Sequence, residues 1–386
     1  MNMDIRKACE TYVANTYKRY PVTFTHGEGA HLWDEEGKEY IDLGSGIAVN
    51  IFGVSDPAWA EAVTKQIHAL PHTCNLYYAE PCARLAEMLC QRTGMQKVFF
   101  SNSGAEANEC MIKAARKYGE KTGRSTIITL KDSFHGRTIA TLAATGQDVF
   151  HQHFGPFPAG FAYAQPNDLE SVRALAAENG ACAVMLEIVQ GEGGVQPLDG
   201  AFLRGVEALC REKGMLLCVD EVQTGNGRCG ELYAYMAYGL APDLVSTAKG
   251  LGGGLPIGAT LFAESVKDVL TYGDHGSTFG GNPVACAGAV SILERIDEEL
   301  LAGVRARGEY IRGELSGAKG VRAVTGLGLM LGIETEKPAA GIVQECLTRG
   351  VLVLTAKTRV RLLPPLTIGW DDLKAAVAIL KEVIAG

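Results

Sequence analysis

Short apolar segments alternate with amphipathic segments through the middle of the chain. Apolar runs of about four to six residues fit strands buried on both faces, and apolar residues three or four positions apart fit helices that cover them. The pattern predicts strands at Val98–Phe100, Thr126–Leu130, Ala183–Leu186, Met215–Val219, Leu244–Ser246 and Ala259–Phe262, and helices at Ala105–Tyr118, Leu169–Ala177 and Phe202–Lys213. This order of strands and helices predicts an α/β fold with a mostly parallel sheet.

The two ends of the chain have a different pattern. The first ~55 residues predict turns and short strands, with a hairpin formed by Ala30–Asp34 and Glu39–Leu43. Beyond a glycine-rich segment, the pattern predicts a helix at Pro283–Arg295, strands at Val321–Val324 and Leu329–Ile333, and helices at 339–348 and 371–384. We expect residues 1–55 to form part of a small domain, 56–280 to form the large domain, and 281–386 to supply a connecting helix and the rest of the small domain.

Composition narrows the class of protein. Of the 386 residues, 47% are hydrophobic and 21% are charged, an ordinary balance for a globular protein with a large core. The net charge of −8 argues against a general partner for nucleic acid or membrane surfaces, although a few arginines still allow a local site for a small anion. The eleven cysteines form no CxxC pair, which favours free thiols in a reducing cytoplasm.

Several other kinds of segment are absent from the sequence. The N-terminal stretch Met1–Lys7 has no apolar region, so we expect no signal peptide. No apolar run approaches about 18 residues, so we expect no membrane span. There is no HExxH or CxxC metal motif, no GxGxxG and no Walker A sequence, and we expect no metal site.

The strongest chemical pattern is a carboxylate and a lysine at two successive strand ends. Asp220 ends an apolar strand, and Lys249, 29 residues later, lies between another apolar strand and a glycine-rich turn. This pair suits pyridoxal phosphate, because a lysine amine forms a Schiff base with its aldehyde and an aspartate keeps its pyridine nitrogen protonated. The competing interpretations are a solvated surface lysine and a buried salt-bridge aspartate. The glycines after Lys249 and its place beside an apolar strand favour the cofactor.

A phosphate site fits the segment Ser101–Glu109, which follows a strand and begins a helix. Helix N-termini offer free N–H groups and a positive dipole end, and the small residues Ser103 and Gly104 let an anion approach the backbone. The alternative is a helix cap with nothing bound. The neighbouring pair of Asp220 and Lys249 favours the phosphate.

An aromatic residue and an arginine follow the strand at Thr126–Leu130. Phe134 is placed to stack on a planar cofactor ring, and Arg137 to pair with a substrate carboxylate. The alternatives are a core phenylalanine and a surface arginine. We assign His135 a structural role, because Lys249 already supplies a base.

Four further residues are weaker candidates. Gln223 is placed to bind the phenolic oxygen of the cofactor, or is a turn residue. Thr278, in a small polar loop, is placed to reach a phosphate oxygen, or belongs to a plain loop. Glu192, on a flexible turn, either neutralises an arginine or is solvated. Arg361, flanked by apolar residues, binds an anion or forms a structural ion pair.

Taken together, these segments resemble the class III aminotransferases of fold type I, which use pyridoxal phosphate. The resemblance runs from about Tyr20 to the C-terminus, and its matching segments are Gly44–Asn50, Ser101–Glu109, Phe134–Arg137, Gln190–Gly194, Asp220–Gly227, Ala248–Pro256 and Gly276–Pro283. It implies a large domain with a mostly parallel seven-stranded sheet and a smaller α+β domain built from both termini. It also implies a homodimer with shared active sites.

The resemblance assigns a role to each candidate. For the cofactor, Ser103 and Gly104 hold the phosphate, with Ala105 where many relatives have threonine, and Phe134 stacks on the ring; Asp220 meets the pyridine nitrogen, Gln223 the phenolic oxygen, and Lys249 forms the Schiff base. For the substrates, Arg137 binds the donor carboxylate and Arg361 the keto-acid carboxylate, while Glu192 neutralises an arginine when one substrate lacks the matching carboxylate. Ser277 lies near the substrate, and Thr278 reaches the phosphate in the neighbouring subunit.

The implied reaction is transamination between an ω-amino donor and 2-oxoglutarate. The stretch Gly46–Val49 resembles the branch that uses N-acetylornithine. Other donors remain open at this point: ornithine, succinylornithine, N-succinyl-diaminopimelate and 4-aminobutyrate. An aminomutase or racemase on the same scaffold, and a non-catalytic binding protein, are the alternatives of other classes.

Overall fold

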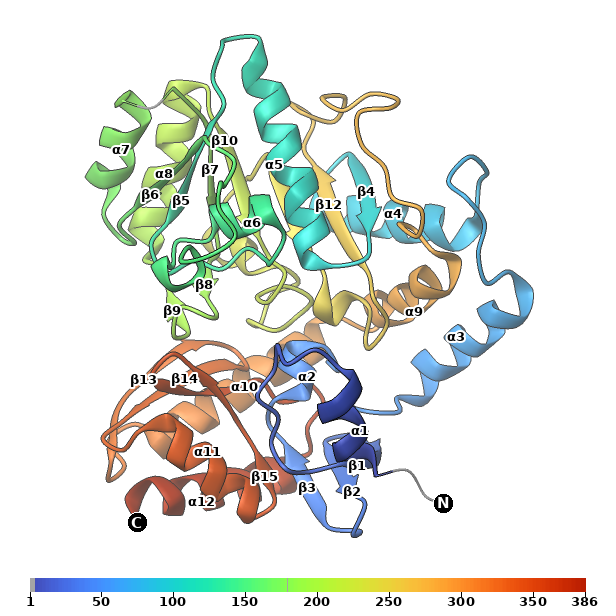
Figure 1. Cartoon of the computed structure of the whole chain (residues 1–386), viewed down its shortest axis with the longest axis vertical. Helices are drawn as coiled ribbons and strands as arrows, with labels where there is room; N and C mark the ends of the chain where they lie inside the picture. The colour runs from blue at the N-terminus through green and yellow to red at the C-terminus, as the bar shows by residue number, and fades with distance from the viewer. Residues whose placement is uncertain (1–3, 179) are drawn as a thin grey trace.

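The computed structural model describes residues 4–178 and 180–386. Residues 1–3, which begin the stretch expected to hold no signal peptide, lie outside the described residues. The molecule has two halves (Figure 1). One half contains a large sheet covered by helices, and both chain termini lie in the other half. Among the described residues, no helix has the length and apolar character needed to span a membrane.

The larger half contains a seven-stranded sheet, as the family resemblance implies. In spatial order its strands are β4 (Lys97–Ser101), β12 (Gly258–Phe262), β11 (Leu244–Thr247), β10 (Leu216–Asp220), β7 (Ala181–Leu186), β5 (Thr126–Leu130) and β6 (Phe161–Ala164). Only β12 runs antiparallel to its neighbours, so the sheet is mostly parallel, as predicted. The edge strand β6 was not predicted; it is a run of only four apolar residues, three of which are half-buried.

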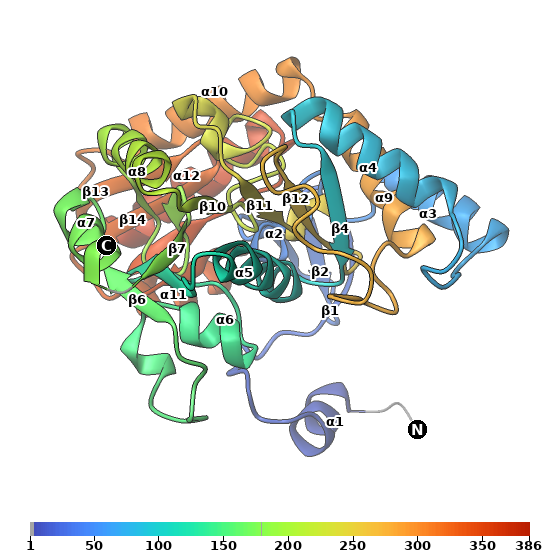
Figure 2. The same cartoon turned by 90° about the horizontal axis from the view of Figure 1, so that it is seen from above.

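Helices cover both faces of this sheet because its strands are apolar on both sides. In β10, Leu216 and Cys218 pack in the cluster that contains α5 (Gly104–Glu120), while Leu217 and Val219 pack in the cluster that contains α8 (Gly200–Lys213). Figure 2 shows α5 and α8 on opposite sides of the strands. Successive residues of a strand point to opposite faces, so both faces are buried.

Further helices complete this half. α3 (Pro57–Ala69) and α4 (Glu80–Thr93), which were not predicted, pack against α9 (Pro283–Glu294). The remaining elements are α6 (Ile139–Ala144), α7 (Leu169–Glu178), the strand pair β8 (Val189–Gln190) and β9 (Gln196–Pro197), and the 3-10 helices η1 (Asp148–Phe150), η2 (Ala234–Tyr238) and η3 (Lys249–Leu251).

The other half joins the two ends of the chain, as expected. β1 (Phe24–Glu28), β2 (His31–Asp34) and β3 (Glu39–Asp42) form a sheet with β15 (Val351–Leu352), which pairs in parallel with β3. A second sheet contains β13 (Val321–Leu327), β14 (Met330–Thr335), β16 (Leu354–Ala356) and β17 (Arg359–Leu362), with helices α10 (Glu298–Leu315) and α11 (Ala339–Thr348) beside it. Helix α12 (Trp370–Ala385) packs against α10, α11 and β15. The division at 55/56 and 280/281 stays a prediction.

The prediction that the first ~55 residues contain only turns and short strands is wrong. Helix α1 (Ile5–Tyr12) lies there, and the side chain of Asp4 accepts a hydrogen bond from the backbone N–H of Lys7 at its start. Ile5, Ala8, Cys9 and Tyr12 recur at helical spacing and could have marked this helix, although none of its residues is buried. The short segment α2 (Ser45–Ala48) also lies in this region.

Candidate functional site

A cavity of about 460 Å³ opens at the edge of the sheet where β4, β10 and β11 end. The carboxyl ends of parallel strands meet at one edge, which is where α/β proteins bind their ligands. Most of the predicted site residues line this cavity: Ser103, Gly104, Ala105, Phe134, Arg137, Asp220, Gln223 and Lys249. The cavity therefore brings together residues that lie far apart in the sequence.

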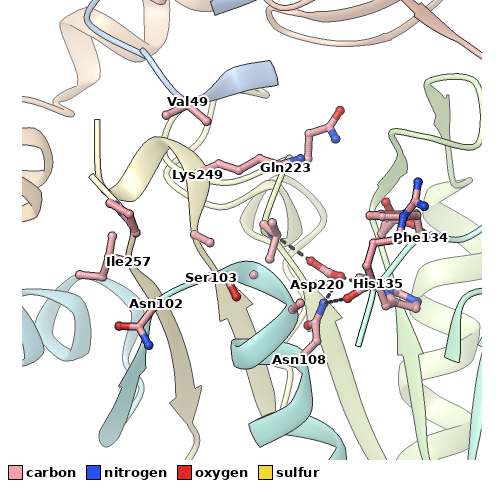
Figure 3. Close-up of a pocket in the computed structure, with 18 of the residues that line it drawn as sticks. Val49, Asn102, Ser103, Asn108, Phe134, His135, Asp220, Gln223, Lys249 and Ile257 are labelled. Carbon is pink, nitrogen blue, oxygen red and sulfur yellow. Dashed lines mark hydrogen bonds and ion pairs between the residues drawn. The ribbon is translucent and has the colours of Figure 1, made fainter. Parts of the chain in front are cut away.

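Lys249 begins η3, directly beyond β11, and its side chain extends into the cavity (Figure 3). Its backbone φ is 46°, a strained value for a residue other than glycine, and such strain is concentrated at functional sites. Removal from water lowers the pKa of the amine to about 8, although the charge of Glu192 opposes this shift. At neutral pH the uncharged, nucleophilic form is therefore more populated than in an exposed lysine.

Asp220 ends β10 and is 4% exposed. Its Oδ1 accepts a hydrogen bond from the backbone N–H of Val222 at 3.0 Å, and its Oδ2 accepts one from Asn108 Nδ2 at 2.7 Å. The Nδ1 atom of His135 lies 2.8 Å from the same Oδ2 (Figure 3). These contacts fix the carboxylate in one orientation at the wall of the cavity.

Two of these partners have a larger place in the site than the sequence suggested. His135 was assigned a structural role, and its contact with Asp220 shows which group it supports. Asn108 lies in the predicted phosphate segment but was given no role. It is 1% exposed on the buried face of α5, and an amide on an otherwise apolar helix face was the signal that marked it.

The predicted phosphate segment forms the N-terminus of α5. Ser103 is the N-cap, and its Oγ accepts a hydrogen bond from the backbone N–H of Glu106 at 3.2 Å. A Cβ atom at Gly104 would lie 2.6 Å from Val222, so only glycine fits there. The first N–H groups of a helix lack partners within it, and here they are placed beside the cavity.

A buried carboxylate that was given no role connects two walls of the site. Glu187 Oε2 accepts a hydrogen bond from the backbone N–H of Phe134 at 2.9 Å, and its Oε1 accepts one from Gly191 at 3.3 Å. Burial raises the pKa of Glu187 to about 7; the charge of His135 opposes the shift and that of Asp220 adds to it. Glu187 therefore fixes the backbone of Phe134 relative to the turn that carries Glu192.

The structure pairs two candidates that the sequence had placed separately. Arg361, on β17 and 3% exposed, donates from Nη1 to Glu192 Oε1 at 2.5 Å and to Gln223 Oε1 at 3.2 Å. Burial acts to raise the pKa of Glu192, but the charge and hydrogen bond of Arg361 lower it below its ordinary value. Arg361 and Glu192 lie behind Gln223, next to the cavity but outside its lining.

Ser277 and Thr278 do not line this cavity in the single chain. Ser277 Oγ accepts hydrogen bonds from Asn102 Nδ2 at 3.1 Å and from the backbone N–H of Gly280 at 2.9 Å. Thr278 is exposed. Their predicted roles stay predictions.

The segment α2 beside the cavity has an unusual backbone. Ser45, Gly46, Ile47 and Ala48 all have positive φ, and the next residue, Val49, lines the cavity. A β-branched residue such as Ile47 at φ 64° is strained. The stretch that carries the resemblance to the N-acetylornithine branch thus reaches the cavity through Val49, directly after four residues of positive φ.

Beside Asp220, the fully buried Glu221 predicts a pH dependence of stability. Burial raises its pKa from 4.5 to about 7, against the hydrogen bonds from Thr224 and the backbone of Tyr235. A raised folded-state pKa adds stability below about pH 4.5, and this stability is lost as the pH rises through 7. As the pH rises from about 4.5 to 7, we expect the unfolding free energy of the original protein to fall. Over the same range the unfolding free energy of Glu221→Gln, which has no carboxylate to titrate, should fall by ~3 kcal/mol less. Urea unfolding at both pH values measures this, and parallel pH profiles would contradict it.

The residues at the cavity fit pyridoxal phosphate. The site offers an amine of lowered pKa, an oriented carboxylate, a helix N-terminus for a phosphate, and an aromatic side chain. The side chain of Asn108 and the ring of His135 point at Asp220, and no lysine or arginine among the described residues forms an ion pair with that carboxylate. These are the groups that the chemistry of this cofactor requires.

Comparison with known proteins gives one consistent result. Residues 12–384 match the family model described as Aminotransferase class-III. An acetylornithine aminotransferase of Haemophilus ducreyi is 51% identical, over 99% of this chain and 98% of its own length. Two solved structures are similar to this one. An N-acetylornithine aminotransferase of Stenotrophomonas maltophilia has a TM-score of 0.85 and 35% sequence identity, over 98% of each chain. An ornithine aminotransferase of Toxoplasma gondii has a TM-score of 0.94 and 30% identity, over 98% of this chain and 94% of its own. The chain belongs to the class-III aminotransferases and is a pyridoxal phosphate-dependent enzyme of that family.

Proposed function

We propose that this enzyme transfers the terminal amino group of N2-acetylornithine to 2-oxoglutarate. The products are N-acetylglutamate 5-semialdehyde and glutamate, in arginine biosynthesis. The observation that carries this proposal is that, of two arginines beside the cavity, one is paired with a carboxylate and the other is not. Arg361 is paired with Glu192, whereas no hydrogen bond or ion pair to Arg137 is found within residues 4–178 and 180–386.

Two arginines in different states suit two substrates of different charge. N2-acetylornithine has one carboxylate, remote from its reacting amine, and we assign this carboxylate to Arg137. Its reacting end then lies near Arg361, whose charge stays neutralised by Glu192. The acceptor 2-oxoglutarate has a second carboxylate, which displaces Glu192 from Arg361. Bidentate pairing of arginine with carboxylate accounts for both steps.

The proposed proton transfers use Lys249 and Asp220. When bound, pyridoxal phosphate supplies a ring that accepts the electrons left when a substrate carbon loses its proton. Lys249 Nζ is the base that takes this proton and later returns it, and its lowered pKa of about 8 suits both directions near neutral pH. Asp220, fixed by Asn108 and His135, holds positive charge on the ring nitrogen.

We also propose a homodimer in which each subunit completes the site of the other. Large apolar side chains are exposed near the loop that carries Thr278: Leu76, Tyr77, Tyr78, Tyr272 and Phe279. Asn75 Nδ2 donates to the carbonyls of Ser277 and Gly280, so these two loops lie together. A second copy that covers them would bring Thr278 to the phosphate of its neighbour. The eleven free cysteines support a cytoplasmic location.

A panel of amino donors tests the proposal. We expect kcat/KM for N2-acetylornithine to exceed that for ornithine and 4-aminobutyrate by about 10-fold or more, the order that one well-recognised group gives. The measurement is steady-state turnover with and without 2-oxoglutarate. If kcat/KM is higher for free ornithine than for N2-acetylornithine, ornithine is the donor and the proposal is wrong. Turnover without 2-oxoglutarate would indicate an isomerase.

A further inference from the structure

Arg137 lines the cavity and is exposed, and its guanidinium contacts two aromatic rings. Its guanidinium carbon lies 4.4 Å from the ring centroid of Phe150 and 5.6 Å from that of Phe134. Within the described ranges, no carboxylate or carbonyl oxygen accepts a hydrogen bond from it. Two aromatic rings are therefore its main contacts, and we call Phe134 and Phe150 the aromatic clamp.

We infer that Phe150 is a positioning residue, which holds the Arg137 guanidinium ready to bind the substrate carboxylate. The inference rests on the proposed function, since it assigns that carboxylate to Arg137. Phe134 lines the cavity and belongs to the residues that resemble the family, whereas Phe150 lies outside the cavity lining on η1. Phe150 therefore acts on the substrate through the residues it contacts, Arg137 and Phe134, and a donor without a carboxylate separates the two routes.

The geometry of a guanidinium explains why aromatic contacts serve this purpose. A ring attracts the cation through its face, while the five N–H donors lie in the guanidinium plane and point outward. Contact with a ring therefore restrains Arg137 without using its donors. An acidic partner would use them, as Glu192 does for Arg361. The aromatic clamp leaves Arg137 free for a carboxylate in both half-reactions.

Phe150 is itself held in place by the segment that carries Phe134. Gln147 Nε2 donates to the carbonyl of Ser133 at 3.0 Å, and the backbone N–H of Gly146 donates to Ser133 Oγ at 3.0 Å. The backbone N–H of Phe150 donates in turn to the carbonyl of Gln147 at 3.0 Å. The rings of Phe134 and Phe150 meet edge to face, with centroids 5.8 Å apart. These bonds fix the second ring relative to the first.

A second arginine–phenylalanine pair in this chain provides a matched control. The Arg116 guanidinium lies over the ring of Phe161 at 4.9 Å, and it also donates to the carbonyl of Ala159 at 2.6 Å. Neither residue lines the cavity. Phe161→Leu therefore removes the same kind of contact away from the site.

The test compares Phe150→Leu, Phe150→Tyr and Phe161→Leu as holoenzymes. The first half-reaction is followed by the spectral change of the cofactor with two donors: N2-acetylornithine, and pentylamine, which has no carboxylate. We expect Phe150→Leu to raise the half-saturating concentration of N2-acetylornithine about three- to fivefold, on the order of one cation–π contact at an exposed site. Its response to pentylamine and its maximal rate stay within about twofold. Phe150→Tyr, which keeps a ring, and Phe161→Leu behave like the original enzyme.

A binding measurement separates this inference from the proposed function. Glutarate, a dicarboxylate that cannot react, is titrated calorimetrically into each holoenzyme, and we expect severalfold weaker binding to Phe150→Leu alone. If the original enzyme does not convert N2-acetylornithine, the proposed donor is wrong, and the glutarate titration still decides the role of Phe150. Unchanged glutarate binding by Phe150→Leu, or an equal loss with both donors, would overturn the inference.

Discussion

Replacing Lys249 with alanine is expected to lower kcat by about 10⁴-fold or more, a larger loss than any other single substitution in the site should cause, since one residue supplies both the base and the covalent attachment. Its lowered pKa of about 8 and its strained φ of 46° indicate a site built around this amine. The measurement combines steady-state turnover with the visible absorbance of the bound cofactor, and we expect both to be lost.

The control for this substitution is Lys267→Ala. Lys267 is remote from the cavity lining and pairs with Glu264 at the surface. Surface ion pairs contribute little, so we expect normal turnover and absorbance. Normal turnover by Lys249→Ala itself would contradict the assignment of the lysine.

Asp220→Asn is expected to give the second largest loss, a fall in kcat of about 10³-fold, within the range of acid–base effects. The amide has nearly the same shape and still accepts the hydrogen bond from Val222, but it has no charge to hold a proton on the ring nitrogen. We expect cofactor binding to weaken less than kcat falls. Turnover and cofactor titration together give this comparison.

Asp243→Asn is a matched control for the aspartate. Asp243 Oδ2 accepts a hydrogen bond from the backbone N–H of Leu217, and it lies before β11, at the opposite edge of the sheet from Asp220. Its replacement alters a carboxylate of the same sheet without touching the cavity. Equal losses of kcat in the two variants would mean that Asp220 acts through the fold, and not on the cofactor.

Much of the fold followed from the sequence because its strands are apolar on both faces. β5 was predicted with its bounds, and β7, β10, β11 and β12 within two residues at each end. β6 and α1 were missed although both carry a signal, since Phe161–Ala164 is a four-residue apolar run and α1 has Ile5, Ala8, Cys9 and Tyr12 at helical spacing. Short apolar patterns such as these do not by themselves separate a strand or a helix from a loop.

The sequence predicted individual residues of the site, but it did not predict which of them contact one another. Asp220 ends β10 and Lys249 follows β11, its parallel neighbour, so a parallel sheet alone places them at one edge. The contact of His135 with Asp220 joins residues 85 positions apart, and that of Arg361 with Glu192 joins residues 169 apart. Such contacts depend on how loops pack on the sheet, which no local pattern encodes. The positive φ values of Ser45–Ala48 likewise have no sequence pattern that predicts them.

The attachment of the cofactor to Lys249 is the claim on which the account depends, and chemical trapping tests it most directly. The holoenzyme is reduced with borohydride and digested, and its peptides are analysed by mass spectrometry. We predict a phosphopyridoxyl group on the peptide that contains Lys249, and on no other lysine. Label on a different lysine, or a reduced holoenzyme without label, would contradict the account.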